Sequence, residues 1–210
     1  MANILVFGDS IDYGFYDNEG GWVDRLKRYL FALSRERNLE HDLKVYNLGI
    51  SGDTTTEILD RFDCETKPRN WENQETIVVF SIGLNDSVII LEKNKMPMNQ
   101  FITNIDLLLK KAKVYTNKIV FIGPTPVDEL LVTPMPWSPT EFWFNREIRK
   151  YDRTLRKICR KSKVDYIELF NKFVKRKYKQ LLEDGAHPNT KGHELIFKIV
   201  KKYLEEKKCV

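Results

Sequence analysis

Short apolar runs alternate along this chain with longer segments in which apolar residues recur at helical spacing. Five of the runs are nearly continuous and rich in β-branched residues, which is typical of strands that are covered on both faces. They occupy residues 4–7, 45–48, 77–82, 119–122 and 164–167. The pattern therefore predicts five buried β-strands.

Between these runs, four segments place their apolar side chains on one stripe of a helix. The stripes consist of Trp22, Val23, Leu26, Leu30 and Leu33; Phe101, Ile102, Ile105, Leu108, Leu109 and Ala112; Ile148, Tyr151, Leu155, Ile158 and Cys159; and Leu195, Ile196, Ile199 and Val200. Strands that alternate with helices form parallel sheets with helices on both faces. We therefore predict an α/β fold, a three-layer α/β/α sandwich around a five-stranded parallel sheet. Ligands bind such sheets at the carboxyl ends of the strands.

Composition places the chain among ordinary globular proteins. Its 210 residues are 42% hydrophobic and 31% charged, and no repeat, low-complexity tract or change in composition marks a boundary. We therefore predict a single domain over residues 1–210. The apolar runs are far too short to cross a bilayer, and no basic segment precedes the first of them. Neither a membrane span nor a secretory signal is expected.

Charge and cysteine usage exclude two further classes. The net charge of +5 is too small to indicate a nucleic-acid partner, and the basic segments 149–163 and 172–179 are expected to form solvated helix faces. The three cysteines, Cys64, Cys159 and Cys209, are an odd number without paired spacing, which predicts neither a disulfide framework nor a metal site. A reducing, cytoplasmic location is the simplest expectation.

The loop after the first predicted strand carries a serine that could act as a nucleophile. This strand runs into the sequence GDSIDYG, which begins at Gly8. Ser10, between a strand and a helix, can expose its hydroxyl near helix N–H groups. A helix N-cap is the alternative role for this serine.

The loops after the second and third strands offer hydrogen-bond donors. The second strand leads into NLGISGDT, whose glycines let backbone N–H groups point into a cleft. Ser51 in this loop is a rival nucleophile, and Asp53 or Thr54 can equally cap the next helix. The third strand ends in GLND, where the Asn85 carboxamide can donate to a developing negative oxygen. A turn in which Asn85 bonds its own backbone is the alternative.

A carboxylate and an imidazole lie three residues apart near the C-terminus, in the sequence DGAHP at residues 184–188. Asp184 can accept a hydrogen bond from Nδ1–H of His187, which leaves Nε2 to take a proton from a hydroxyl. His41 lies in a charged stretch and His193 inside a predicted helix, so neither is the expected base.

Together, and in this order, the four segments resemble the SGNH hydrolase family, also called GDSL-type esterases and lipases. The resemblance extends from Gly8 to Pro188, and the four segments match at the family's defining positions. Ile11 stands where the family usually has leucine, a departure that leaves the implied roles intact.

The resemblance implies a role for each matching residue and an order for the strands. Ser10 would be the nucleophile of a catalytic triad with His187 and Asp184. The Ser10 amide, Gly52 and Asn85 would form the oxyanion hole. The strand order would be 2-1-3-4-5, as in flavodoxin, which the periodicity alone does not show.

The resemblance also implies a reaction: hydrolysis of small-molecule esters through an acyl-enzyme, without a metal or an organic cofactor. Carbohydrate O-deacetylation, thioester cleavage and lysophospholipid hydrolysis would use the same residues and remain alternatives. A flavodoxin-like module that only binds a ligand is an alternative of another class, although no GxGxxG or Walker pattern supports it. The ordinary α/β-hydrolase fold is disfavoured because the chain lacks a GxSxG sequence.

A segment rich in proline and aromatic residues follows the fourth strand, over residues 124–144. Its position at the carboxyl edge and its length predict an apolar wall for the substrate. Trp137, Phe142 and Trp143 of this segment, with Val88 from the loop after Asn85, are the candidate substrate-binding residues. Packing against a neighbouring helix, or contact between subunits of a homo-oligomer, are the alternatives.

Overall fold

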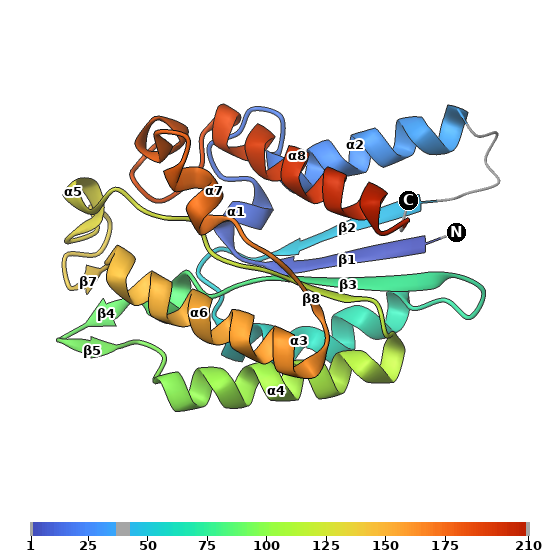
Figure 1. Ribbon diagram of the computed structural model, residues 1–210, viewed down its shortest axis with the longest axis horizontal. Coiled ribbons are helices and arrows are strands. Elements are labelled where there is room, and N and C mark those ends of the chain that lie inside the picture. Colours follow the sequence, from blue (N-terminus) through green and yellow to red (C-terminus); the bar gives the residue numbers. More distant parts are fainter. Residues whose placement is uncertain (1, 37–42, 209–210) are drawn as a thin grey trace.

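A five-stranded parallel sheet forms the centre of the computed structural model, which describes residues 2–36 and 43–208 (Figure 1). Its strands are β1 (Ala2–Gly8), β2 (Leu43–Gly49), β3 (Glu75–Ser81), β6 (Ile119–Ile122) and β8 (Asp165–Ile167). They lie in the order β2-β1-β3-β6-β8, and every neighbouring pair is parallel. The five predicted strands and the order 2-1-3-4-5 are therefore confirmed. His41 and Cys209 lie outside the described residues.

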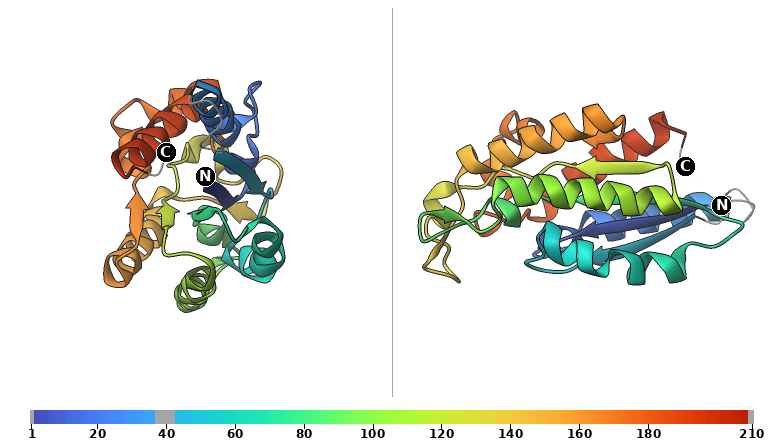
Figure 2. Two further views of the ribbon diagram at one scale, coloured as in Figure 1. Left: turned by 90° about the vertical axis from the view of Figure 1, so that its right-hand side faces the viewer. Right: turned by 90° about the horizontal axis from the view of Figure 1, so that it is seen from below.

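Helices cover both faces of the sheet, as Figure 2 shows in the view along the strands. One face carries α2 (Gly21–Glu36) and α8 (Thr190–Glu206), with α1 (Ser10–Tyr13), α7 (Phe170–Val174) and the 3-10 helix η3 (Tyr178–Leu181) near the ends of the strands. The other face carries α3 (Thr55–Thr66), which η1 (Lys67–Arg69) follows, together with α4 (Met98–Tyr115) and α6 (Asn145–Ser162). The α/β/α sandwich and the four predicted helices are confirmed.

Alternate residues of β1 enter two separate cores, which explains why the strand is apolar at every position. Ile4 and Val6 pack in the cluster that includes α2 and α8, whereas Leu5 and Phe7 pack in the cluster that includes α3 and α4. All four are completely buried. Burial of one such side chain contributes roughly 1.5–3 kcal/mol, so both layers are needed to cover the sheet.

A second, smaller sheet was not predicted. It is antiparallel and consists of β4 (Ile89–Ile90), β5 (Lys93–Asn94) and β7 (Glu141–Phe142), in the order β5-β4-β7. Strands of two residues are too short to show a period of two in a sequence. This sheet joins the loop after β3 to segment 124–144, which also contains α5 (Glu129–Val132).

Two observations concern the cysteines and the helices. Cys64 and Cys159 are free thiols, the first exposed and the second buried. Within residues 2–36 and 43–208, no helix is both long enough and apolar enough to cross a bilayer.

Candidate active site

Ser10 is the first residue of α1, directly after β1, and its position is fixed by a cap at Asp9. The Asp9 carboxylate accepts the N–H of Ile11 at 2.9 Å, and the Asp9 N–H donates to the Asp12 carboxylate at 3.0 Å. Such a reciprocal cap satisfies amides that have no partner inside the helix. Ser10 itself is therefore not the N-cap, and its hydroxyl is left available for another partner.

That partner is His187, which comes from the other end of the chain. Ser10 Oγ lies 2.9 Å from Nε2 of His187, and Nδ1 of the same ring lies 2.6 Å from Oδ2 of Asp184. Because a carboxylate only accepts hydrogen bonds, the Nδ1–H donates to Asp184 and Nε2 is left to accept from the hydroxyl. The structure thus brings together the three residues that the sequence separates by up to 177 positions.

The turn from Asp184 to His187 has little freedom to adopt another geometry. The second oxygen of Asp184 accepts the backbone N–H groups of Ala186 at 2.9 Å and His187 at 2.8 Å. Gly185 has φ +94°, and a Cβ there would lie 2.7 Å from the Cβ of Leu131, so only glycine fits. Burial alone would raise the pKa of Asp184, but the hydrogen bonds from His187 and the two amides outweigh it and lower this pKa. Asp184 is therefore ionised, and its carboxylate can orient the imidazole of His187.

The loop after β2 leaves open space at Gly52. Gly52 has φ +86°, and nothing lies within 4 Å of the position a Cβ would take. Among the described residues, its N–H donates no hydrogen bond. Asp53, the next residue, pairs with Arg61 at 2.8 Å, and Arg61 also donates to the carbonyl of Leu48 at 2.7 Å, which holds this loop to the end of β2. Gly52 therefore offers an amide that a bound anion could use.

Asn85, at the start of η2 (Asn85–Ser87), reaches the same region but is already engaged. Its Nδ2 donates to the carboxylate of Asp9 at 3.2 Å and to the carbonyl of Asp53 at 3.1 Å. The side chain is only 8% exposed. The predicted oxyanion donor thus lies close to Ser10, with both of its amide hydrogens directed at acceptors of the protein.

Three buried carboxyls lie beneath these loops, and burial raises the pKa of each. The pKa of Asp9 rises to about 6, as does that of Asp86, while that of Asp12 lies well above its ordinary value. Asp86 accepts the N–H of Thr55 at 3.0 Å and its hydroxyl at 2.6 Å, which joins the Asn85 segment to the start of α3. Asp12 accepts the indole N–H of Trp22 at 2.9 Å. These carboxyls hold together the loops that carry Ser10, Gly52 and Asn85.

Three half-exposed aromatic rings surround the imidazole of His187. The ring centroids of Phe15, Tyr16 and Trp137 lie 5.4, 5.7 and 5.8 Å from its centroid. Trp137 was predicted near the site, but Phe15 and Tyr16 were not. The cluster of aromatic residues that closely follows Ser10 in the sequence was the available signal.

The other predicted substrate-binding residues lie elsewhere. Val88 is 1% exposed and belongs to the core. Trp143 is also buried, beneath Trp137, and its indole N–H donates to the carbonyl of Leu84 at 3.0 Å. Phe142 stacks on Phe144 and lines a different groove beside β4. Of the four, only Trp137 combines exposure with contact to the triad.

The remaining polar residues that the sequence offered as candidates lie outside the cluster of Ser10, His187 and Asp184. Ser51 is exposed, and within the described residues it bonds no histidine. Thr54, rather than Asp53, is the N-cap of α3. His193 is completely buried in α8, where it contacts the N–H of Trp22 and the carbonyl of Phe15.

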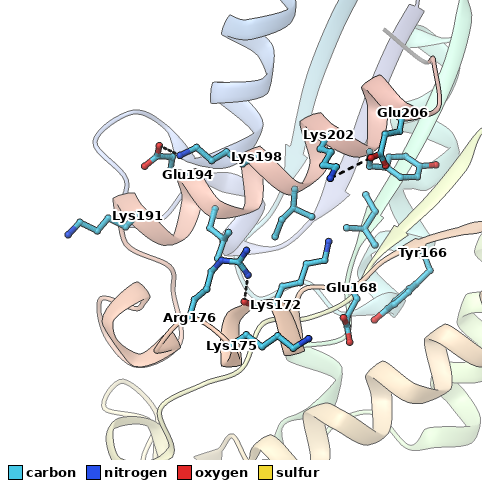
Figure 3. Close-up of a pocket in the computed structure, with 14 residues that line it drawn as sticks. Tyr166, Glu168, Lys172, Lys175, Arg176, Lys191, Glu194, Lys198, Lys202 and Glu206 are labelled. Carbon is cyan, nitrogen blue, oxygen red and sulfur yellow. Dashed lines mark hydrogen bonds and ion pairs between the residues drawn. The ribbon is translucent and has the colours of Figure 1, made fainter.

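A large basic groove lies apart from this site, between α8 and the segment from β8 to α7 (Figure 3). Its volume is about 930 Å³. From segment 172–179, Lys172, Lys175 and Arg176 line the groove, and the segment is divided between α7 and η3, so it does not form one helix face. Two of the lysines opposite, Lys198 and Lys202, are paired with glutamates of their own helix. None of the residues predicted for the triad or the oxyanion hole lines this groove, so it belongs to a separate surface.

Known proteins are similar to this chain over nearly its whole length. An esterase from Saccharomyces cerevisiae described as isoamyl acetate-hydrolyzing is 25% identical, over 96% of this chain and 85% of that protein. The crystal structure of a lipase/acylhydrolase from Enterococcus faecalis superposes with a TM-score of 0.76 at 22% identity, covering 99% of this chain and 97% of that one. An acetylxylan esterase from Geobacillus stearothermophilus superposes with a TM-score of 0.71 at 20% identity, covering 97% and 93%.

The match to a family profile assigns the chain to a family, because it covers most of the sequence. The profile of the GDSL-like lipase/acylhydrolase family matches residues 6–195, a range that contains every element of the site described above. A module that only binds a ligand is thereby set aside. The chain belongs to the GDSL-like lipase/acylhydrolase family, also called the SGNH hydrolases, and is a hydrolase that acts on ester bonds.

Proposed function

We propose that the enzyme is a serine esterase that hydrolyses carboxylic esters through an acyl-enzyme on Ser10. The hydrogen-bonded chain from Ser10 through His187 to Asp184, at 2.9 and 2.6 Å, is the observation that carries the proposal. These are the distances over which a proton can pass from the hydroxyl to the imidazole. The low pKa of Asp184 supports its role as the carboxylate that stabilises the imidazolium.

In the first step Ser10 Oγ attacks the ester carbonyl and His187 Nε2 takes its proton. The negative carbonyl oxygen is stabilised by the N–H groups of Ser10 and Gly52 and by Nδ2 of Asn85. The bond to the leaving oxygen then breaks while His187 returns the proton to it, so that an alcohol departs. In the second half of the reaction His187 removes a proton from water, and the resulting hydroxide attacks the acyl carbon. The bond from the acyl carbon to Ser10 Oγ then breaks while His187 returns the proton to Oγ, which releases the acid and restores both residues.

We further propose that short acyl groups, with acetate foremost, are the preferred acyl part. Two similar proteins are an isoamyl acetate-hydrolyzing esterase and an acetylxylan esterase, whose names both contain an acetate ester. Hydrolysis of thioesters or lysophospholipids would use the same triad. A thioester, however, has a thiol as its leaving group, and a lysophospholipid has a long acyl chain.

A series of p-nitrophenyl esters and one thioester tests this proposal. We expect kcat/KM to be highest for the acetate, to fall through the butyrate to the octanoate, and to be lower for a thioacetate. A maximum at the octanoate would contradict the preference for short acyl groups. A fluorophosphonate probe should label the enzyme and its Ser51→Ala variant but not Ser10→Ala; labelling of Ser10→Ala would contradict the assigned nucleophile.

A further inference from the structure

A polar groove begins at Tyr16, one of the three rings that surround His187. Its volume is about 460 Å³. Apart from Tyr16, it is lined by the polar residues Asn18, Gln180, Glu183, Asn189, Thr190 and Lys191. The N–H of Glu183 donates to the carbonyl of His187 at 2.8 Å, so the wall of the groove is continuous with the candidate active site.

The chemistry of the proposed reaction decides which part of a substrate would occupy this groove. The imidazole must deliver its proton to the leaving oxygen, so the alcohol part of the ester lies against His187. The carbonyl oxygen lies on the other side, toward Gly52 and Asn85. The rings of Tyr16 and Trp137, which contact the imidazole, therefore border the alcohol part.

The segment that carries Tyr16 is held in a conformation that few residues adopt. Tyr16 has φ +59°, in the left-handed region that non-glycine residues seldom occupy. The carbonyl of Phe15 lies 3.0 Å from Nε2 of the buried His193. Asp17 accepts the N–H of Gly21 at 3.1 Å and pairs with Arg25 at 2.9 Å. Because these bonds fix both sides of Tyr16, its ring is positioned in advance of any substrate.

The side chains of the groove suit a ligand that is rich in hydroxyl groups. Those of Asn18, Gln180, Glu183 and Lys191 are exposed, and within the part of the chain that the structure describes none of them has a hydrogen-bond partner. A long alkyl chain laid here would bury little apolar surface and would take water from these amides and charges without replacing its hydrogen bonds. A sugar would satisfy them through its hydroxyls while one face of its ring packs on an aromatic side chain.

We infer that this groove is the leaving-group site for an esterified carbohydrate, an inference that rests on the proposed serine-esterase function. The sugar unit whose hydroxyl is esterified packs against Tyr16 and Trp137, and further units extend toward Asn18 and Gln180. Ser10 Oγ first bonds to the acyl carbon, and the ester bond to the sugar oxygen breaks when the resulting oxyanion collapses. His187 then gives its proton to that oxygen, and the free sugar leaves before water enters.

Acetate esters that differ only in the alcohol test this inference. For the wild type, we expect kcat/KM to rise from ethyl acetate to a mono-acetylated xylopyranoside and again to a mono-acetylated xylotriose. Tyr16→Ala and Trp137→Ala should each lower kcat/KM for both sugar esters about tenfold more than they lower kcat/KM for ethyl acetate, the loss of one aromatic contact with the sugar. The double variant Asn18→Ala/Gln180→Ala should remove only the gain from the monosaccharide to the trisaccharide.

Three controls separate this result from damage to the fold or to the catalytic step. Trp71 and Asn73 are exposed and precede β3 at the opposite end of the sheet, so Trp71→Ala and Asn73→Ala should leave all three substrates unchanged. Trp137→Phe, which keeps a ring, should restore most of the sugar preference. The rate of deacylation, measured after the alcohol has left, gives the part of any loss in Tyr16→Ala that comes from His187, and the loss for the sugar esters should exceed it.

The possible outcomes distinguish the two proposals. If benzyl acetate exceeds both sugar esters and depends on Tyr16 to the same extent, the rings bind apolar alcohols and the carbohydrate inference is wrong. Equal losses for ethyl acetate and the sugar esters also overturn it. Binding of unacetylated xylotriose to Ser10→Ala, measured by calorimetry, does not depend on catalysis; absence of binding refutes the groove even when Ser10 is the nucleophile. If Ser10→Ala still hydrolyses esters, the proposed function fails whatever the groove binds.

Discussion

The two halves of the proposed active site are held in different ways. In the half proposed to transfer the proton, Ser10, His187 and Asp184 bond one another, and the Asp184 carboxylate accepts the backbone N–H groups of Ala186 and His187. In the half proposed to face the carbonyl oxygen, the Gly52 N–H donates no hydrogen bond among the described residues, while Asn85 donates to Asp9 and to the Asp53 carbonyl. The proton-transfer half is thus complete before substrate arrives, whereas Asn85 must share or exchange a partner when an oxyanion forms.

This difference predicts that the residues of the proton-transfer half act as a unit. Ser10→Ala and His187→Ala should each lower kcat about 10⁶-fold, and the double variant should be no slower than either single variant. The reason is that the hydroxyl without a base, or the base without a hydroxyl, performs no acyl transfer. Turnover of p-nitrophenyl acetate measures the effect, with Ser51→Ala as the unaffected control. A double variant much slower than both single variants would show that Ser10 and His187 do not act as a unit.

Asp184→Asn is expected to have the next largest effect. The asparagine oxygen can still accept the N–H groups of Ala186 and His187, but its amide would donate to Nδ1 and so favour the tautomer with a proton on Nε2. That tautomer cannot take the proton of Ser10, and kcat should fall about 10⁴-fold, as in serine hydrolases of other folds. Circular dichroism checks that the fold is intact. A loss below about tenfold would show that Asp184 does not orient the imidazole.

Asn85→Ala should have a smaller effect, because Asn85 is one of three donors. We expect kcat to fall about 10²–10³-fold, with KM little changed, since the donor acts mainly on the transition state. Steady-state kinetics with p-nitrophenyl acetate measures both constants. If kcat falls less than about twofold, Asn85 is a structural partner of Asp9 and the oxyanion is held by backbone amides alone.

The smallest effect concerns stability and the buried carboxyl of Asp86. Its pKa is about 6 in the folded protein against an ordinary value of 3.8, so the folded state retains a proton that the unfolded chain has released. The free energy of unfolding therefore loses a contribution as the pH rises from about 4 to about 6, and above that range the loss is constant. A shift of about two pH units corresponds to at most about 3 kcal/mol.

Urea unfolding of Asp86→Asn tests this dependence. The asparagine is neutral at every pH, so the free energy of unfolding of the variant, relative to wild type, should rise by about 1–3 kcal/mol between pH 4 and pH 6 and then stay level. A difference that is flat, or that falls over this range, would show that Asp86 is not held protonated by burial.

Much of the fold could be predicted because its signals are local. Strands buried on both faces must be apolar at successive positions, as Leu5 and Val6 are, and helices that cover them must carry a stripe such as Leu26 and Leu30. The small sheet formed by β4, β5 and β7 could not be predicted, because pairs such as Ile89 with Phe142 depend on contacts between distant segments.

The candidate site likewise has features that could be predicted from local sequence and features that could not. The residue types and their order pointed to Ser10, Asp184 and His187, because acyl transfer requires those groups. Contacts between distant residues are not encoded locally. No sequence pattern indicates that Asn85 donates a hydrogen bond to Asp9, or that Tyr16 lies beside His187. The position and length of segment 124–144 also predicted an apolar wall that includes Trp143, with Val88 from the loop after Asn85. Both residues are buried, because a sequence does not distinguish an apolar residue of the core from one at the rim of a site.

The central claim is that the acyl group is carried by Ser10. The most direct test is to mix the enzyme with p-nitrophenyl acetate, stop the reaction with acid within the first turnovers, and map the modified peptide by mass spectrometry. The account predicts one acetyl group on the peptide that contains Ser10, and none on the same peptide of Ser10→Ala. An acetyl group on Ser51, or rapid hydrolysis with no acetylated intermediate at any time, would contradict it.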